Sequence, residues 1–182
     1  MEPVKRLKRE IAYKGDILEV FADTVQTKDG TISRWDYIDH IGAAAVVPVL
    51  PDGRIVLVRQ YRNALDRFTL ELPAGKLDFR GEPMEACAAR ELEEETGYHS
   101  ESLEWLVTLN TTVAFCNEKI GVYVARDLQK TEQHLDPDED VEVTAYPVKE
   151  LVQMVLEGKI TDAKTAAGIL AYQVKCAGCR AE

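Results

Sequence analysis

The sequence predicts an α+β fold, because β-prone runs and helix-forming runs are mixed along the chain without a regular strand–helix–strand alternation. Two turn-forming groups, Lys28-Asp29-Gly30 and Pro51-Asp52-Gly53, each separate a pair of β-prone runs. A stretch of strong helix formers ends at Thr96 and is followed by Gly97, a natural carboxyl cap. With 182 residues, the chain is long enough for one domain and a small appendage. We expect a β unit at residues 1–40 and a larger domain at 41–182.

The expected elements follow from these signals in chain order. The two β-prone runs within 17–40 predict a hairpin, and the runs 42–50 and 54–62 predict paired core strands. Residues 70–83 are too rich in Pro and Gly for long regular structure, and Glu82-Pro83 suits the start of a helix that runs to Thr96. Further strands are expected at about 103–109, 119–126 and 141–146. Two more helices are expected at 147–157 and 161–175.

Composition excludes several classes of function. The net charge of -10 opposes a sequence-independent hold on nucleic acid or on an anionic membrane. The longest apolar run, 41–50, is far shorter than the roughly 20 residues of a membrane span, and the basic amino terminus does not continue into a secretory signal. We therefore expect a cytoplasmic protein that acts on a small molecule, with no nucleic-acid and no membrane partner.

The four cysteines indicate reduced thiols rather than a disulfide framework. Cys176 and Cys179 alone are close in sequence, in the segment CAGC. A zinc or redox protein built on this pair is one hypothesis, which metal analysis of the purified protein would decide.

Residues 89–98, ARELEEETGY, concentrate four carboxylates on the predicted helix. At 100° per residue, Glu91, Glu94 and Glu95 project from one stripe about 100° wide, while Glu93 points away. Like charges at these spacings repel each other, so either water screens them on a solvated face or a cation lies among them. Hard divalent ions such as Mg²⁺ prefer oxygen ligands, and the Gly- and Pro-rich turn before the helix can add a backbone carbonyl.

The segment GKLDFRGEPMEACAARELEEETGY resembles the signature of the Nudix hydrolases. The positions that match that signature are Glu82, Arg90, Glu91, Leu92, Glu94, Glu95 and Gly97. Six residues lie between Gly75 and Glu82, where the signature has five, and the extra residue falls in the turn before the helix. The resemblance implies a Nudix-type α/β/α sandwich with a mixed sheet at 41–182, and an N-terminal β hairpin unit that serves dimerisation and base binding. It also implies metal-assisted hydrolysis of a diphosphate.

The resemblance further implies roles for particular residues. Mg²⁺, or Mn²⁺, would be held by Glu91, Glu94, Glu95 and the carbonyl of Ala74. Glu94 and Arg90 would belong to the catalytic group, with Arg90 pairing with neighbouring carboxylates to fix their rotamers. Glu82 would support the same carboxylates. A water-activating base would come from the acidic segment HLDPDEDVEV, in which Glu139 is the first candidate and Asp138 and Asp140 are its rivals.

Substrate-binding residues are implied in the same way. Arg59 and Arg62, in RQYR, would contact phosphate, although surface arginines need no such role. Trp35 would stack on the base, although an aromatic in a hairpin ordinarily packs on its sheet. Glu71, which begins ELPAGKL, completes the substrate-binding set. The family branch also implies a homodimer formed by swapped N-terminal strands.

ELPAGKL, NEKIGVYVARDL and LEGKITDAKTAAGIL resemble the ADP-ribose and nucleoside-diphosphate-sugar hydrolases. Enzymes specific for ADP-ribose carry a Pro-Gly-x-Ser type turn beyond the signature, where this chain has TVAFCNE at 112–118. The expected activity is therefore Mg²⁺-dependent hydrolysis of ADP-ribose or of sugars such as GDP-mannose, giving a nucleoside monophosphate and a sugar phosphate. The alternative is a non-catalytic regulatory Nudix protein that binds nucleotide sugars.

Overall fold

The computed structural model describes residues 4–15, 18–135, 137 and 139–178. Its contacts divide the chain into two compact units. The first comprises Met1–Ile41 and Asn110–Glu118, and the second comprises Gly42–Leu109 and Lys119–Glu182. In the part of the chain that is described, no helix is long and apolar enough to cross a membrane. Of the cysteine pair in CAGC, Cys179 lies outside the described residues.

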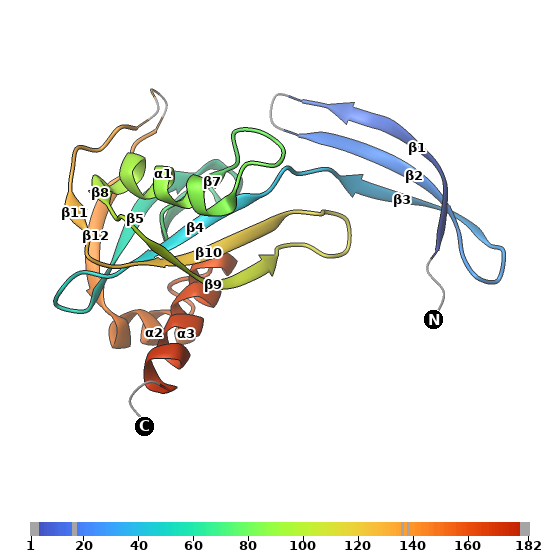
Figure 1. Ribbon diagram of the computed structural model, residues 1–182. Helices are drawn as coiled ribbons and strands as arrows, with labels where there is room; N and C mark the ends of the chain where they lie inside the picture. The colour runs from blue at the N-terminus through green and yellow to red at the C-terminus, as the bar shows by residue number, and fades with distance from the viewer. Residues whose placement is uncertain (1–3, 16–17, 136, 138, 179–182) are drawn as a thin grey trace. The chain divides into compact units, whose positions relative to one another are not determined.

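The first unit contains a three-stranded antiparallel sheet in the order β1 (Lys5–Lys14), β2 (Glu19–Gln26), β3 (Ile32–Ile38). The predicted hairpin is confirmed as β2 and β3, which pair in continuous register from Val20↔Ile38 to Gln26↔Ile32 (Figure 1). β1 was not predicted from the sequence. Its pairing with β2 shifts register twice, and these irregularities break the two-residue alternation that marks a strand.

The strands of the second unit form three sheets. The four-stranded sheet has the order β7 (Ala74–Lys76), β4 (Ala43–Pro48), β10 (Lys119–Ala125), β9 (Leu103–Asn110), and it is mixed because β4 is parallel to β10 and antiparallel to β7. An antiparallel sheet contains β12 (Glu142–Pro147), β5 (Arg54–Arg62) and β6 (Arg67–Glu71). The smallest pairs β11 (Gln129–Lys130) with β8 (Tyr98–His99). The strands expected at 103–109, 119–126 and 141–146 are thus confirmed as β9, β10 and β12.

The predicted pairing of the runs 42–50 and 54–62 is wrong. β4 and β5 belong to different sheets and meet only at an isolated antiparallel bridge, Val49↔Ile55, beside the turn. β4 is wholly buried, and so is the 55–58 run of β5. A buried apolar run carries no alternation that would identify its partner. Instead of pairing with each other, β4 pairs with β10 and β5 pairs with β12, both of which lie far along the chain.

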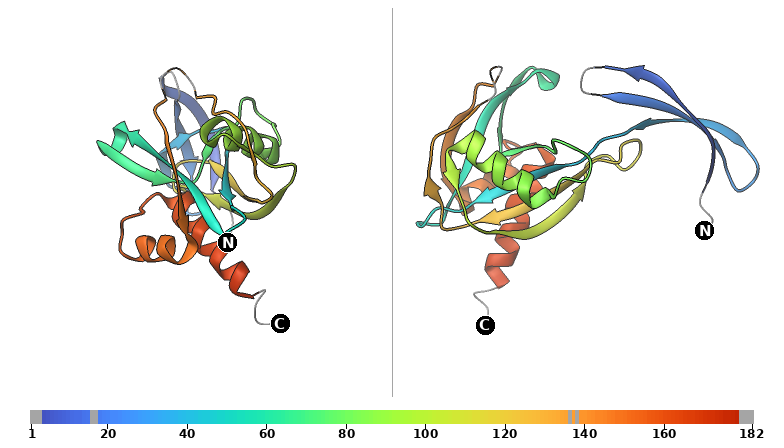
Figure 2. Two further views of the ribbon diagram at one scale, coloured as in Figure 1. Left: turned by 90° about the vertical axis from the view of Figure 1, so that its left-hand side faces the viewer. Right: turned by 45° about the horizontal axis from the view of Figure 1, so that its top comes forward.

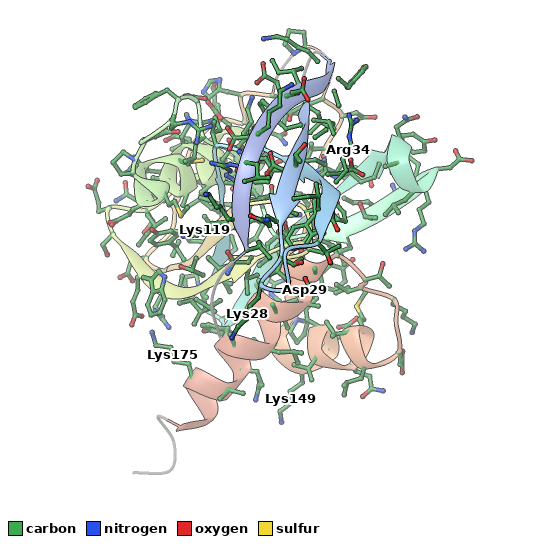
Figure 3. All side chains as sticks on the ribbon, turned by 90° about the vertical axis from the view of Figure 1, so that its right-hand side faces the viewer. Lys28, Asp29, Arg34, Lys119, Lys149 and Lys175 are labelled. Atoms are coloured by element: carbon green, nitrogen blue, oxygen red, sulfur yellow. The ribbon has the colours of Figure 1, made fainter. Side chains whose placement is uncertain are left out.

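Helices cover both faces of the mixed sheet, which confirms the α/β/α sandwich (Figures 1 and 2). α1 (Met84–Thr96) packs on β4 and β7, while α3 (Ala163–Gly178) packs on β4 and β10 and contacts α2 (Val148–Leu156). A 3₁₀ turn, η1 (Asn63–Leu65), joins β5 to β6. Lys149 on α2 and Lys175 on α3 project outward (Figure 3). Gly97 ends α1 in the left-handed conformation (φ 63°), as expected of a carboxyl cap.

The core of the second unit lies between these layers and fixes which face of α1 turns inward. β4, β5 and β10 contribute mainly Val and Ile, and α3 contributes Ile169 and Tyr172. Cys87, Ala88 and Leu92 of α1 are fully buried. Burial of these side chains holds α1 against β7, a short strand within the Pro- and Gly-rich segment 70–83.

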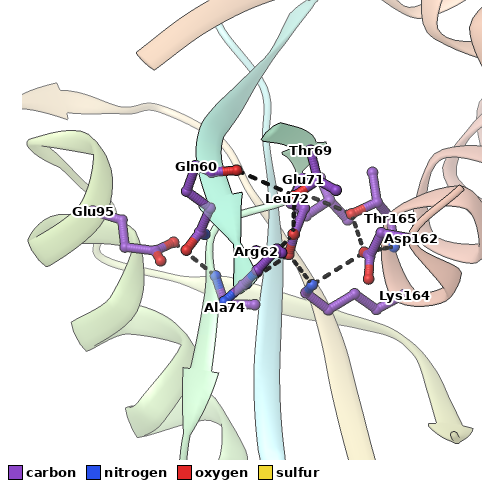
Figure 4. A network of polar contacts seen from close by, with 10 residues as sticks. All are labelled: Gln60, Arg62, Thr69, Glu71, Leu72, Ala74, Glu95, Asp162, Lys164 and Thr165. Atoms are coloured by element: carbon purple, nitrogen blue, oxygen red, sulfur yellow. Dashed lines mark hydrogen bonds and ion pairs between the residues drawn. The ribbon is translucent and has the colours of Figure 1, made fainter. Parts of the chain in front are cut away.

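A polar bridge joins the start of α3 to β6 and the residue after it (Figure 4). Asp162 caps α3, since its Oδ2 accepts the Thr165 backbone N–H at 3.0 Å. The Thr165 hydroxyl also accepts the buried Leu72 backbone N–H at 2.9 Å. Beside this contact, Glu71 accepts hydrogen bonds from Arg62 and Lys164. The bridge therefore fixes the chain immediately before β7.

Glu71 is buried, with only 2% of its surface exposed. Burial alone would raise its pKa, but the ion pairs with Arg62 and Lys164 and the hydrogen bond from Thr69 outweigh burial and lower the pKa to about 2. In the unfolded chain this carboxyl has its ordinary pKa of 4.5. Its ionised form therefore stabilises the fold above about pH 5, and this contribution is lost as the pH falls toward 2.

Glu71→Gln should lower the free energy of unfolding by about 3 kcal/mol at pH 7, because it leaves Arg62 and the largely buried Lys164 without their shared carboxylate. The difference from wild type should shrink to less than half at pH 3, where the wild-type carboxyl takes up a proton on unfolding. Urea unfolding at pH 7, 5 and 3 measures both values. Glu142→Gln, in the exposed pair with Arg59, is the control and should change stability by about 0.5 kcal/mol or less. A difference for Glu71→Gln that does not vary with pH would contradict this account.

Candidate active site

A cavity of about 240 Å³ lies in the second unit between β7, its following turn, α1 and the two residues His134 and Glu139. It brings together Ala74, Arg90, Glu91, Glu94 and Glu139, which are far apart in sequence. Its lining is completed by Gly75, Lys76, Asp78 and His134. Most of the predicted metal-binding and catalytic residues therefore surround one space, and Glu95 lies beside it through its contact with Ala74.

Gly75 lets the Glu91 carboxylate approach the backbone of β7. A Cβ atom built at position 75 would lie 2.0 Å from Glu91 Oε1 and 2.2 Å from its Cδ. Such distances are far below van der Waals contact, so a side chain here would expel the carboxylate. The absence of a side chain at Gly75 thus creates the place that Glu91 occupies.

Glu95 is buried at 3% exposure and is tied to the same strand, since its Oε2 accepts the Ala74 backbone N–H at 2.9 Å. Burial raises the pKa of Glu95 to about 8, and the charges of Glu91 and Glu139 add to the shift. The Ala74 hydrogen bond and the charge of Lys164 oppose it. Glu95 is therefore an anion that the metal-free fold accommodates poorly.

Glu91 has the same character. Burial raises its pKa to about 7, and the neighbouring charges of Glu94 and Glu139 reinforce the shift. Arg90 opposes it through its charge and its hydrogen bond. Glu94 is more open to solvent, with 39% of its side chain exposed, and Glu93 pairs with His99 on another side of the helix. The stripe of three glutamates expected from the helical period is present, with Glu93 turned away.

Arg90 bridges the glutamates. Its Nη1 donates to Glu91 Oε1 at 2.7 Å and to Glu94 Oε2 at 3.0 Å, so the contact expected between residues one turn apart is formed. Nη2 donates to the Lys76 carbonyl at 3.3 Å and lies 3.4 Å from Asp78. Its Nε is buried and has no hydrogen-bond partner among the described residues. Burial acts to lower the pKa of Arg90, but the combined effects of neighbouring groups, with the charge of Glu91 the largest of them, outweigh burial, so the pKa lies above its ordinary value.

The donor set fits a hard divalent cation. Among the described residues, no three histidine, cysteine or acidic side chains are grouped to hold a metal ion by themselves. However, Glu91 Oε2, Glu94 Oε1 and Glu95 Oε1 accept no hydrogen bond from the described residues. Ions such as Mg²⁺ use few protein oxygens and take the remainder from water and phosphate. The unused oxygens on the three carboxylates match that requirement, and the raised pKa values of Glu91 and Glu95 add to it.

Asp78 and His134 line the cavity but were not predicted from the sequence. Asp78 lies in the turn that carries the extra residue, where its backbone N–H donates to Glu82 Oε2 at 2.7 Å. Glu82 thereby supports the turn and reaches Arg90 Nη2 at 4.0 Å. His134 is held beside the cavity because its backbone N–H donates to the Glu94 carbonyl at 3.0 Å. The only sequence signal for His134 was its place in the acidic segment of Glu139. Of the rivals to Glu139, Asp140 is exposed and does not line the cavity, and Asp138 lies outside the described residues.

The predicted substrate-binding arginines and Glu71 do not line this cavity. Arg62 donates from Nε and Nη2 to both oxygens of Glu71, at 2.8 and 2.7 Å, with 41% of its side chain exposed. Arg59 turns elsewhere, packing 4.0 Å from the centre of the Phe68 ring and pairing with Glu142 at 2.9 Å. Glu71, being buried and saturated with donors, orients Arg62 in this structure.

Trp35 lies in the first unit and lines a cavity of about 600 Å³, a volume typical of small-molecule sites. Arg34, Asp36 and Phe115 lie around the same cavity, together with Val20, Ile38 and Ala114. Almost half of Trp35 is exposed. It is therefore not the packed sheet residue that aromatic side chains in hairpins usually are.

The chain resembles known proteins along most of its length. Residues 39–168 match the NUDIX domain family. A methanol dehydrogenase activator from Bacillus methanolicus is 38% identical over 173 residues, covering 94% of this chain and 93% of that protein. An ADP-ribose pyrophosphatase from Bacillus subtilis is 36% identical over 173 residues with the same coverage of both chains.

A solved structure described as an ADP compounds hydrolase superposes with a TM-score of 0.87, covering 98% of this chain and 96% of that one. Its identity of 20% makes it evidence for the fold alone. With the domain match over more than half of its length and relatives above 30% identity along nearly all of it, the chain belongs to the Nudix hydrolase family.

Proposed function

We propose that the chain hydrolyses the diphosphate bond of nucleoside diphosphate sugars. Water adds across the bond between the two phosphoryl groups, and a nucleoside monophosphate and a sugar phosphate are released. The observation that carries the proposal is the cavity that Glu91 and Glu94 line together with Ala74 and Gly75, beside which Glu95 bonds to Ala74. Buried anions with raised pKa values are typical of sites that bind a cation and an anionic substrate together.

Nudix hydrolases use divalent metal ions, and for this chain we propose Mg²⁺ or Mn²⁺. Glu91, Glu94, Glu95 and the Ala74 carbonyl would hold the ions. Bound there, a divalent ion supplies Lewis-acid polarisation of phosphoryl oxygens and makes an acidic cavity attractive to a diphosphate.

Arg90 holds the glutamates in position, since one of its nitrogens contacts both Glu91 and Glu94. Glu139, which lines the cavity and whose charge acts on both Glu91 and Glu95, is the group we assign to take the proton from the attacking water. His134 and Asp78 flank these groups and contribute polar surface to the cavity.

Arg62 is the phosphate-binding arginine of this proposal. Its bond to Glu71 uses the Nε and Nη2 edge, so the Nη1 edge remains for a phosphate oxygen. Trp35 provides an aromatic face for the base. A phosphate-binding role for Arg59 has less support, because its guanidinium packs on the Phe68 ring and pairs with Glu142.

ADP-ribose is the first substrate to test, since relatives named ADP-ribose pyrophosphatase are 36% identical to this chain. GDP-mannose is the second, because TVAFCNE at 112–118 departs from the turn of strict ADP-ribose enzymes.

The chain is also proposed to form a homodimer by exchange of N-terminal strands, which the exposed Leu7, Ile11 and Ile32 of the first unit support. A monomeric mass in sedimentation equilibrium would contradict the dimer.

A regulatory protein without catalysis is the second candidate, because one relative is named a methanol dehydrogenase activator. The complete glutamate set argues against it, since a sensor has no need of so many mutually repulsive carboxylates.

A panel of nucleotide sugars with Mg²⁺ or Mn²⁺ separates the two candidates. We expect ADP-ribose or GDP-mannose to be converted to nucleoside monophosphate and sugar phosphate, identified by chromatography. Tight binding without turnover of any member of the panel would favour the regulatory candidate instead.

Glu94→Gln and Glu95→Gln should each lower kcat by about a hundredfold or more, because each removes charge needed to hold a metal ion. Folding should persist, since Gln can still accept the Ala74 N–H and since burial already raises the pKa of Glu95 to about 8. Steady-state kinetics and thermal unfolding measure the two effects. Glu93→Gln on the same helix is the control and should retain wild-type kcat. Near-normal turnover of both site variants would reject the assignment.

Glu139→Gln should lower kcat by about a hundredfold and flatten the rise of kcat/KM on the acid side of the pH profile, because the group that accepts the proton is gone. Rates measured across the pH range at saturating metal test this. Asp140→Asn, exposed and outside the cavity lining, is the control. An unchanged rate and profile for Glu139→Gln would assign the base elsewhere.

Trp35→Ala should raise KM for the nucleotide sugar about tenfold while kcat changes little, since loss of base stacking costs about 1–3 kcal/mol of binding. Trp105→Ala, an exposed tryptophan of β9 outside that cavity, should leave both constants unchanged. Equal effects of the two substitutions would mean that Trp35 has no specific contact with the base.

A further inference from the structure

Lys164 is the second residue of α3, and its side chain is only 11% exposed. Its ammonium lies 2.5 Å from Glu71 Oε2 and 3.0 Å from Asp162 Oδ2 (Figure 4). A lysine so well covered is uncommon and costs desolvation, which its two carboxylate partners offset. The expected metal and catalytic residues do not include it.

The carboxylate of Glu71 has every acceptor position filled. Oε1 accepts from Arg62 Nε at 2.8 Å and from the Thr69 hydroxyl at 2.6 Å. Oε2 accepts from Arg62 Nη2 at 2.7 Å and from Lys164. Four donors match the four lone-pair sites of a carboxylate, so the plane of Glu71 is fixed and the guanidinium bonded along its edge is fixed with it.

The charges of this cluster balance. Arg62 and Lys164 are cations, Glu71 and Asp162 are anions, and each carboxylate has a close cationic partner. If Lys164 were neutral, Glu71 Oε2 would have Arg62 as its only partner and the cluster would carry an excess negative charge. That charge would hold Arg62 more tightly to Glu71 and weaken the pull of any phosphate on its remaining N–H groups.

We propose that Lys164 is a positioning residue, which by sharing Glu71 with Arg62 keeps the Nη1 edge of Arg62 oriented and available for a substrate phosphate. The inference rests on the proposed function in one respect, namely that Arg62 binds phosphate. Among the described residues, Lys164 forms ion pairs with Glu71 and Asp162. The charge of Lys164 also acts on Glu95, so the same lysine influences the acidic cavity.

The decisive variant is Lys164→Met, which keeps the length of the side chain and removes its charge. We expect KM for ADP-ribose, or for whichever nucleotide sugar the panel identifies, to rise about tenfold while kcat stays within about threefold. Lys164→Arg, which restores the charge, should bring KM back to within about threefold of wild type. Lys164→Gln is made in parallel, so that the result does not depend on the folding of a single variant.

Lys175→Met is the matched control. Lys175 lies on the same helix and pairs with Glu104 at 2.5 Å, but it projects outward far along α3 (Figure 3). Thermal unfolding of both methionine variants measures any general damage from losing a lysine ion pair. The control should leave KM and kcat at their wild-type values.

A double-mutant cycle with Arg62→Ala distinguishes positioning from a purely structural link between α3 and β6. If Lys164 acts through Arg62, Lys164→Met should raise KM no further in the Arg62→Ala background. Calorimetric titration of the same nucleotide sugar in EDTA, where no turnover occurs, should show the same loss and the same non-additivity in Kd.

An unchanged KM for folded Lys164→Met and Lys164→Gln would overturn the assignment, as would effects of Lys164→Met and Arg62→Ala that multiply. Wild-type protein that turns over no nucleotide sugar would overturn the proposed function instead, and the titration in EDTA would still decide the role of Lys164. The two proposals therefore fail on different measurements.

Discussion

The structure depends on the crowding of glutamate carboxylates between α1 and β7. Glu91 and Glu95 are withdrawn from water, and Arg90 is the cation that contacts Glu91 and Glu94 directly. Burying anions costs free energy that Arg90 only partly offsets. The metal ion that we propose would relieve the remaining repulsion among these carboxylates.

The same residue type takes opposite character in two places a short distance apart along the chain. Glu71 is as buried as Glu95, yet its pKa falls to about 2 while that of Glu95 rises to about 8. The difference lies in the partners. Arg62 and Lys164 bond Glu71 directly, whereas the Glu95 side chain accepts its hydrogen bond from the neutral Ala74 N–H. Glu71 is therefore a structural anion, and Glu95 is suited to bind a cation.

These two environments are held together by the short segment that runs from β6 to β7. At its start, Glu71 and Leu72 are fastened to α3 through Lys164 and Thr165. At its end, Ala74 is fastened to α1. Helices on opposite faces of the mixed sheet thus both bond to the segment 71–74, which ends at Ala74, the residue that offers the proposed carbonyl ligand. A site built in this way is preorganised by the layers of the fold rather than by the turn itself.

The sequence by itself determined the class of fold, the extent of α1 and the register of its glutamates, because these follow from local periodicity and from Gly97 as a cap. Only the tertiary structure decided that β4 and β5 belong to different sheets, since wholly buried runs do not encode their partners. It also decided that His134 joins the cavity and that Glu71 is shared by Arg62 and Lys164. These contacts join residues far apart along the chain, and no local pattern specifies them.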